Sequence, residues 1–343
     1  MRVVPVTHIA RPIADHRRRA KARLRREGAV AAALALPLAA VVFTAAPASA
    51  AVHYMVTHTI PVSGSAAGIA VDSATHTAYV ANYSKNTVLV INEATNTITH
   101  TIPVGNGADV LAVDPAAGTV YVTNAVSGTV SVIDTTTNRV THTISVGPSP
   151  EGIAVDPTTH TVYVSDAESS TLWMIDTVSN RVTHTIPLGS FPVGVAADPA
   201  AGTVYVASES TSSVAVIDAA SNQHTRNIQV HYNPNLVAVD PTTHTLYVST
   251  AHGDGTLSVI DEATDQITHT TDIGSPVHGL AVDPAARTGY LTSRGLVFVY
   301  DLATGAIIAR VPVADSADAA VDPARDTAYV AGSAGVYVIQ PCR

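Results

Sequence analysis

The sequence predicts an all-β fold, a seven-bladed β-propeller of four-stranded antiparallel blades, because one pattern of strand-like runs occurs seven times. Each copy centres on an Ala-Val-Asp signature, with Ala197 replacing the valine once, and a tyrosine follows every signature aspartate by seven residues. The aspartates are separated by 42, 42, 42, 42, 43 and 39 residues, a period typical of propeller blades. They are Asp72, Asp114, Asp156, Asp198, Asp240, Asp283 and Asp322.

Each copy contains four strand-like segments, which the third copy illustrates. Its inner strand, Gly152–Val155, is almost entirely apolar, as expected for a strand covered by neighbouring blades on both sides. Thr161–Ser165 and Thr171–Ile175 are rich in β-branched residues, and Arg181–Ile186 is the polar outer strand. The Asp-Pro turn after the inner strand lets the aspartate accept backbone hydrogen bonds. We therefore interpret the repeated aspartates as structural.

The turn between the third and fourth strands has the form Asp-x-x-Thr/Ser-x in most copies. Its last position holds residue types that tolerate a positive φ, so a left-handed residue is predicted there. These residues are Asn96, Asn138, Asn180, Asn222, Asp265 and Gly305.

The two ends of the repeat array are complementary. The last copy stops after its third strand, Gly335–Ile339, whereas Met55–Val62 reads as a fourth strand without a copy of its own. Joining the two completes blade seven and leaves no open edge between the first and last blades. Residues 51–343 are therefore predicted to form one domain, which we expect to be monomeric.

The first fifty residues resemble a signal peptide rather than part of the fold. A basic segment precedes an apolar run over residues 29–46, and Ala48-Ser49-Ala50 provides a small-residue cleavage site, so we expect cleavage after Ala50. An uncleaved signal anchor is the alternative. Cleavage predicts a secreted or envelope-associated protein that is not stably inserted in a membrane. The one cysteine, Cys342, excludes an intrachain disulfide.

The expected mature chain is strongly acidic. Residues 1–50 hold nine of the 18 Lys and Arg residues and two of the 27 Asp and Glu residues, which leaves 9 basic and 25 acidic residues and a net charge of −16. Such a surface repels phosphate backbones and anionic lipid. Nucleic acid is therefore not an expected partner.

One segment of the second copy, Tyr121-Val122-Thr123-Asn124, reproduces the tetrapeptide for which the YVTN β-propeller repeat family is named. The surrounding Gly-Ile-Ala-Val-Asp-Pro and Thr-Val-Ser-Val-Ile-Asp runs also resemble that family, over nearly the whole expected mature chain. The resemblance implies a seven-bladed propeller that is often exported or surface-associated in prokaryotes, without a single family activity. More distantly similar propellers include sugar lactonases and a streptogramin lyase, whose sites lie at the channel mouth.

Positions that vary among matching copies point to a site, because a ligand does not share the symmetry of the repeat. Five residues before the signature aspartate, the start of the inner strand is expected at the mouth of the central channel. The copies there read Ala67, Asp109, Glu151, Val193, Asn235, His278 and Ala317, and Asp318 adjoins the last. Such a ring suits a divalent metal or general acid–base chemistry, with Asp109, Glu151 and Asn235 as metal candidates and His278 as the catalytic candidate. A water-filled polar channel mouth is the alternative.

Further candidate binding residues lie at the end of the second strand and in the loops of the same face. Asp166 and Glu209 replace the uncharged residues usual at their positions. His252 and Arg294 belong to loops that depart from the repeat template in blades five and six. Nine of the 13 histidines beyond residue 50 recur at template positions, so we do not expect them to ligate one shared site.

Two functions fit these observations. The regular repeat, and the lack of a Gly-x-Ser-x-Gly turn, a His-Glu-x-x-His motif or a phosphate-binding loop, favour a non-enzymatic module without a cofactor that binds a protein, glycan or cell-surface partner through its loop-bearing face. The alternative is a hydrolase or lyase of a lactone-type or cyclic ester at the channel mouth, in which His278 moves protons beside a bound divalent cation. The enzymatic hypothesis requires the side chain of His278 to converge on one bound atom with at least two others of the ring. The candidates for these two are Asp109, Glu151, Asn235 and Asp318.

Overall fold

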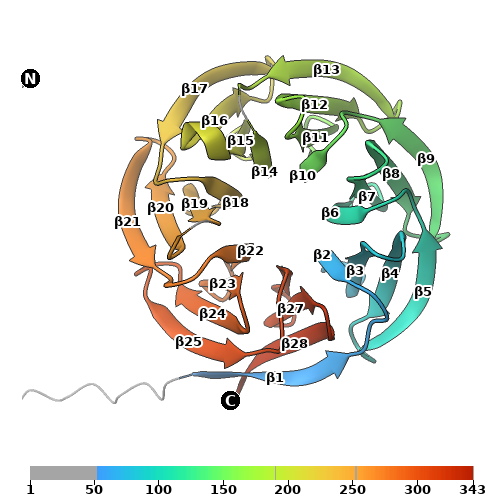
Figure 1. Cartoon of the computed structure of the whole chain (residues 1–343), viewed down its shortest axis with the longest axis vertical. Coiled ribbons are helices and arrows are strands. Elements are labelled where there is room, and N and C mark those ends of the chain that lie inside the picture. The colour runs from blue at the N-terminus through green and yellow to red at the C-terminus, as the bar shows by residue number, and fades with distance from the viewer. Residues whose placement is uncertain (1–51, 190, 252, 343) are drawn as a thin grey trace, which may run out of the picture. The chain divides into compact units, whose positions relative to one another are not determined.

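The computed structural model describes residues 52–189, 191–251 and 253–342. The predicted signal peptide and His252 lie outside these described residues. Seven four-stranded sheets form a ring around a central axis (Figure 1), and every strand pairs antiparallel with its neighbours. The predicted all-β, seven-bladed propeller is confirmed.

Within blades 1 to 6 the strands run outwards from the axis in chain order. Blade 1 comprises β2 (Ala66–Asp72), β3 (Thr77–Asn82), β4 (Thr87–Asn92) and β5 (Thr97–Pro103). Blade 2 comprises β6 (Ala108–Asp114), β7 (Thr119–Asn124), β8 (Thr129–Asp134) and β9 (Arg139–Ser145). Blade 3 comprises β10 (Pro150–Asp156), β11 (Thr161–Asp166), β12 (Thr171–Asp176) and β13 (Arg181–Pro187).

The remaining blades follow the same order. Blade 4 comprises β14 (Pro192–Asp198), β15 (Thr203–Ser208), β16 (Ser213–Asp218) and β17 (Gln223–Gln229), with the short helix η1 (Glu209–Thr211) between its second and third strands. Blade 5 comprises β18 (Pro234–Asp240), β19 (Thr245–Thr250), β20 (Thr256–Asp261) and β21 (Gln266–Asp272). Blade 6 comprises β22 (Val277–Asp283), β23 (Thr288–Ser293), β24 (Leu296–Asp301) and β25 (Ile307–Pro312).

Blade 7 is assembled from both ends of the described chain. It comprises β26 (Asp318–Asp322), β27 (Thr327–Gly332), β28 (Gly335–Cys342) and β1 (His53–Ile60), in the spatial order β1-β28-β27-β26. The register brings Ile60 opposite Val336 and His53 opposite Cys342. The predicted closure of the ring by the N-terminal strand is therefore confirmed (Figure 1).

Apolar side chains between neighbouring blades form the core. The tyrosine that follows each signature aspartate is at most 2% exposed. Tyr329 of blade 7, for example, packs in one cluster with Val80 and Ile91 of blade 1. Each blade thus supplies apolar surface to the next, which explains why the same pattern is repeated seven times.

The turns behave as their residue types predict. Oδ1 of Asp156 accepts a hydrogen bond from the Thr158 amide at 2.8 Å, and the other signature aspartates bind the amides of their own turns in the same way. All six positions predicted to be left-handed have φ between 52° and 67°.

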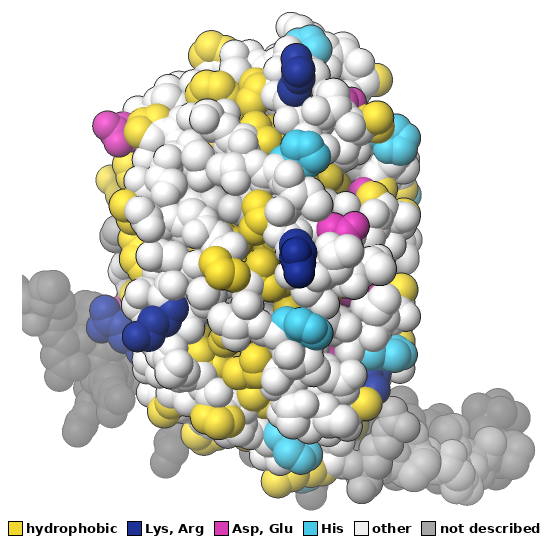
Figure 2. Space-filling view, turned by 90° about the vertical axis from the view of Figure 1, so that its right-hand side faces the viewer, with side chains coloured by type: hydrophobic (Ala, Val, Ile, Leu, Met, Phe, Trp, Pro, Cys, Tyr) yellow, Lys and Arg dark blue, Asp and Glu magenta, His cyan; other side chains and the backbone are white. Residues whose placement is uncertain are grey.

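The outer wall of the ring is formed by the fourth strand of each blade. The wall in Figure 2 presents mainly uncharged polar side chains and backbone, with separate histidines and few charges. His100 and His142 of β5 and β9 are exposed there. Among the described residues, no helix has the length and apolar character needed to span a membrane.

Candidate functional site at the channel mouth

The inner strands bring the predicted ring residues to one end of the channel. Asp109, Glu151, Asn235 and His278 are each the second residue of their inner strand, and Asp318 is the first residue of β26. Equivalent positions in adjacent blades lie at equal height around the axis, so these side chains share the channel mouth. The loops from the second to the third strand and from the fourth strand to the next blade border the same mouth.

Two adjoining cavities occupy the mouth. One of about 480 Å³ is lined by Asp109, His278, Arg294, Asp315 and Asp318 together with apolar and small residues. The other, of about 370 Å³, is lined by Glu151, Glu209, Asn235 and Asp318 among others. Asp318 therefore borders both. The structure brings most of the predicted residues to one channel but divides them between two cavities.

Two carboxyl groups of the mouth are hard to ionise. Burial, and then the negative charge of Glu151, raises the pKa of Asp109 to about 6. Burial raises the pKa of Asp318 to about 7 although its carboxylate accepts hydrogen bonds from the amides of Ile69, at 3.1 Å, and Ala319, at 2.8 Å. The charge of Asp109 adds to this rise. The mouth therefore holds carboxyl groups whose charges repel one another.

The side chains of Asn235 and Glu151 also have structural partners. The Asn235 amide donates to the carbonyl of Val277 in blade 6 at 2.9 Å, and its Oδ1 accepts from Ser249 at 3.0 Å. Oε1 of Glu151 accepts from the hydroxyl of Ser149 at 3.0 Å. Asn235 thus connects two blades, which reduces its freedom to turn towards a ligand.

His278 and the carboxylates do not meet at one point. In the described residues, three or more His, Cys, Asp or Glu ligand atoms lie within 4.8 Å of one another at two places, and neither includes a residue of the channel mouth. The described residues therefore do not bring His278 and two of the mouth carboxylates together in one such cluster. His278 and Arg294 are both exposed, so they can contact a ligand that enters the channel.

The remaining predicted residues have different surroundings. Asp166 is fully buried, and its carboxylate accepts hydrogen bonds from the amides of Ser149 and Ser169 at 2.7 and 2.6 Å. It holds two loops of blade 3 together and offers no exposed surface to a ligand. Glu209 begins η1 and lines the second cavity.

Exposed aromatic side chains lie on the loops of this face and are a second feature of it, beside the polar ring. Tyr83 is 41% exposed, Phe191 44% and Tyr232 81%, and they are the exposed aromatic side chains among the large hydrophobic residues of the described ranges. All three lie in loops that border the channel mouth. Tyr83 replaces the Ala, Glu, Arg or Ser of other copies, and Phe191 replaces a small or polar residue, so departure from the template was the available signal.

Comparisons with known proteins support the architecture. No family model matches the chain, and no curated protein matches it. A solved structure titled hydrazine synthase, from Kuenenia stuttgartiensis, is similar with a TM-score of 0.76 and 21% sequence identity, over 83% of this chain and 97% of that chain. At this identity the similarity shows the propeller fold alone.

Proposed function

We propose that this chain is an exported, non-catalytic propeller of the YVTN type that binds a protein partner through its loop-bearing face. The observation that carries the proposal is that the exposed side chains of Tyr83, Phe191 and Tyr232 lie in loops of the face on which an acidic channel mouth opens. Tyrosine and other aromatic residues are enriched at protein interfaces because they bury a large apolar area at a small cost in side-chain entropy.

The charge of the mouth indicates which group of the partner enters it. Five carboxyl groups line the two cavities, against the single guanidinium of Arg294. Burial and, to a smaller extent, the neighbouring negative charges raise the pKa of Asp109 and Asp318. A lysine or arginine side chain placed there offsets the repulsion between these charges. The proposed ligand is therefore a basic side chain flanked by apolar residues on a protein surface.

Fluorescence anisotropy tests this proposal with the full chain and a set of labelled peptides. Each peptide carries a central Lys-Arg pair between apolar residues, and matched peptides replace the pair with Glu-Glu or Gln-Gln. We expect binding of the basic peptides alone, weakened about tenfold in Asp109→Asn/Asp318→Asn and in Tyr83→Ser/Tyr232→Ser. Val178→Ser, which removes an exposed side chain from the opposite face, is the matched control. Equal binding of acidic and basic peptides would overturn the proposal.

One observation favours the enzymatic alternative. The raised pKa values of Asp109 and Asp318, about 6 and 7, fall in the range in which a carboxyl group exchanges protons near neutral pH. A panel of lactones and cyclic esters, assayed with the native chain, His278→Ala and Asp318→Asn, tests this function. Turnover that both substitutions abolish would replace the binding proposal with a catalytic one.

A further inference from the structure

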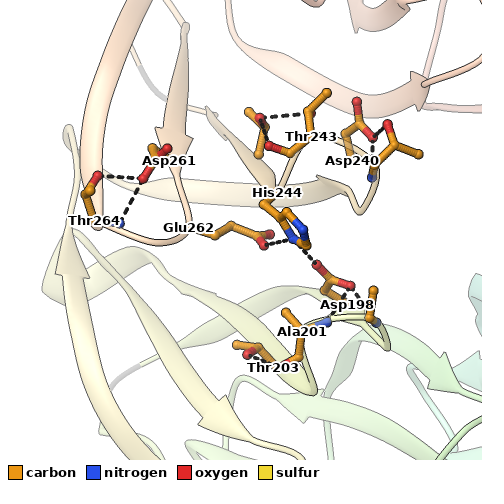
Figure 3. A network of polar contacts seen from close by, with 12 residues as sticks. Asp198, Ala201, Thr203, Asp240, Thr243, His244, Asp261, Glu262 and Thr264 are labelled. Carbon is orange, nitrogen blue, oxygen red and sulfur yellow. Dashed lines mark hydrogen bonds and ion pairs between the residues drawn. The ribbon is translucent and has the colours of Figure 1, made fainter.

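At the opposite ends of the inner strands, three ionisable side chains meet between blades 4 and 5 (Figure 3). Asp198 ends β14, His244 lies in the turn after β18, and Glu262 follows β20 directly. Nδ1 of His244 is 4.0 Å from Oδ2 of Asp198 and 3.8 Å from Oε2 of Glu262. Both distances are too long for hydrogen bonds. The imidazole nitrogen and the two carboxylates instead surround a common point.

Three of the four carboxylate oxygens of this cluster are buried without a hydrogen-bond partner. Asp198 is 1% exposed and Glu262 8%. Oδ1 of Asp198 accepts from the amides of Ala200 and Ala201, but its Oδ2, which faces His244, has no hydrogen-bond partner. Neither side-chain oxygen of Glu262 has one. Leaving such groups unpaired in the protein interior is costly, which indicates that this cluster can bind a cation.

The same three residue types meet a second time, between blades 7 and 1. Asp322 ends β26, His76 lies in the turn after β2, and Glu93 follows β4. Nδ1 of His76 is 3.1 Å from Oδ2 of Asp322, and neither side-chain oxygen of Glu93, which is 2% exposed, has a hydrogen-bond donor. The two clusters occupy equivalent positions in the repeat, and the second one lies at the junction where the ring closes.

We propose that these two clusters are interblade binding sites for a divalent transition metal such as Zn²⁺, each with one His, one Asp and one Glu ligand. Zinc binds imidazole nitrogen and carboxylate oxygen at about 2.0–2.2 Å, so ligand atoms on one ion lie about 3–4 Å apart. The separations around His244 fall in this range. Ca²⁺ and Mg²⁺ prefer oxygen ligands in larger number. Bound metal would connect neighbouring blades on the face opposite the channel mouth.

Blade 3 provides an internal control for this assignment. It has the equivalent histidine, His160, and blade 2 supplies the equivalent aspartate, Asp114, but Thr177 stands where the other two blades have glutamate. The repeat thus contains two complete sets and one set that lacks a single carboxylate. Among the seven copies, a histidine in the turn and a glutamate after the third strand occur together in blades 1 and 5 alone.

The test measures zinc stoichiometry on the full chain, expressed without a histidine tag and stripped with a chelator. After equilibration with ZnCl₂ and removal of free metal, mass spectrometry of the metal content is expected to give two Zn²⁺ per chain. Glu262→Gln should leave one, and Glu93→Gln/Glu262→Gln none. His160→Ala should leave two, whereas Thr177→Glu should raise the number to three. Circular dichroism checks the fold of each variant.

A thermal denaturation series gives an independent readout of the same sites. Zn²⁺ should raise the Tm of the native chain, and Ca²⁺ and Mg²⁺ at the same concentration should not, because metal binding to the folded state alone stabilises it. If the native chain binds no zinc, or if Glu93→Gln/Glu262→Gln retains the native stoichiometry, the proposal is overturned. Thr177→Glu keeps the test decisive should the double variant fail to fold, since a stoichiometry that remains at two would also contradict the assignment.

Discussion

The two ends of each inner strand follow different rules. At the channel mouth the equivalent position ranges from Ala67 to Glu151 and His278, whereas at the other end the signature aspartate is the same in all seven blades. The difference has a physical cause. The aspartate is buried and accepts the amide hydrogen bonds of its turn, while the side chains at the mouth line the cavities of the channel, where several residue types fit. Positions that vary among the blades therefore indicate where a ligand can bind, and positions that are the same in every blade indicate which residues the fold requires.

Both ends of the inner strands keep their positions only in a closed ring, so opening the ring should cause the largest loss of stability. Deleting residues 51–63 removes β1, which pairs with β28 and buries Ile60 and Val62. Two buried side chains of this size contribute about 3–6 kcal/mol, and the lost strand pairing adds to this. We expect Tm to fall by about 10 °C or more in differential scanning calorimetry. Met55→Ala, which truncates a half-exposed side chain of the same strand, should change Tm by about 1–2 °C. A deletion variant with the native Tm would show that β1 does not close the ring.

The second test compares both ends of one strand, β10. Asp156→Ala leaves the amide of Thr158 and the hydroxyl of the same residue without their acceptor, and we expect it to lower the free energy of unfolding by about 2–3 kcal/mol. Glu151→Ala, at the mouth, should cost about 0.5 kcal/mol or less. Urea denaturation of the two variants measures both values. Equal losses would break the distinction between the two ends.

The third test uses pH to examine the mouth. In the folded chain burial raises the pKa of Asp109 to about 6 and that of Asp318 to about 7, above the 3.8 of an ordinary aspartate side chain. The folded state therefore binds more protons than the unfolded state between these values. The stabilisation from these protons is complete below about pH 4 and is lost as pH rises through 6 and 7.

Asp109→Asn/Asp318→Asn removes both ionisations. Relative to the native chain, the variant should gain about 5 kcal/mol of stability between pH 4.5 and pH 8, about 2 kcal/mol from Asp109 and about 3 kcal/mol from Asp318, measured by urea denaturation at each pH. Burial raises the pKa of Glu93 and of Glu262 to about 8. Both groups titrate in the native chain and in the variant, so the difference between the two proteins isolates the mouth. A difference that does not change with pH would mean that these carboxyl groups are solvated like ordinary surface aspartates.

Much of this architecture could be predicted from the sequence because every blade uses the same strands, turns and interblade packing. Seven aspartates with seven tyrosines predicted the blades, and the unmatched strand at residues 55–62 predicted the closure. The residues that meet in the candidate sites were harder to predict from the sequence, because a contact between blades joins residues more than forty positions apart. Asp166 resembled a ligand in the sequence but is buried between loops. His244 appeared to be a template residue, and only the fold brings it beside Asp198 of the preceding blade.

The smallest expected effect concerns Asn235, which lies at the variable end but makes two hydrogen bonds there. Its amide donates to Val277 of the next blade and its oxygen accepts from Ser249, so Asn235→Ala should cost about 1 kcal/mol, more than Glu151→Ala and less than Asp156→Ala. Urea denaturation resolves this order when the three variants are measured together. If Asn235→Ala lowers the free energy of unfolding as little as Glu151→Ala does, the hydrogen bonds of Asn235 do not stabilise the fold. Its side chain is then available to a ligand. If Asn235→Ala instead lowers the free energy of unfolding as much as Asp156→Ala does, one residue of the mouth is as necessary to the fold as the signature aspartate. The mouth then contains both structural and variable positions.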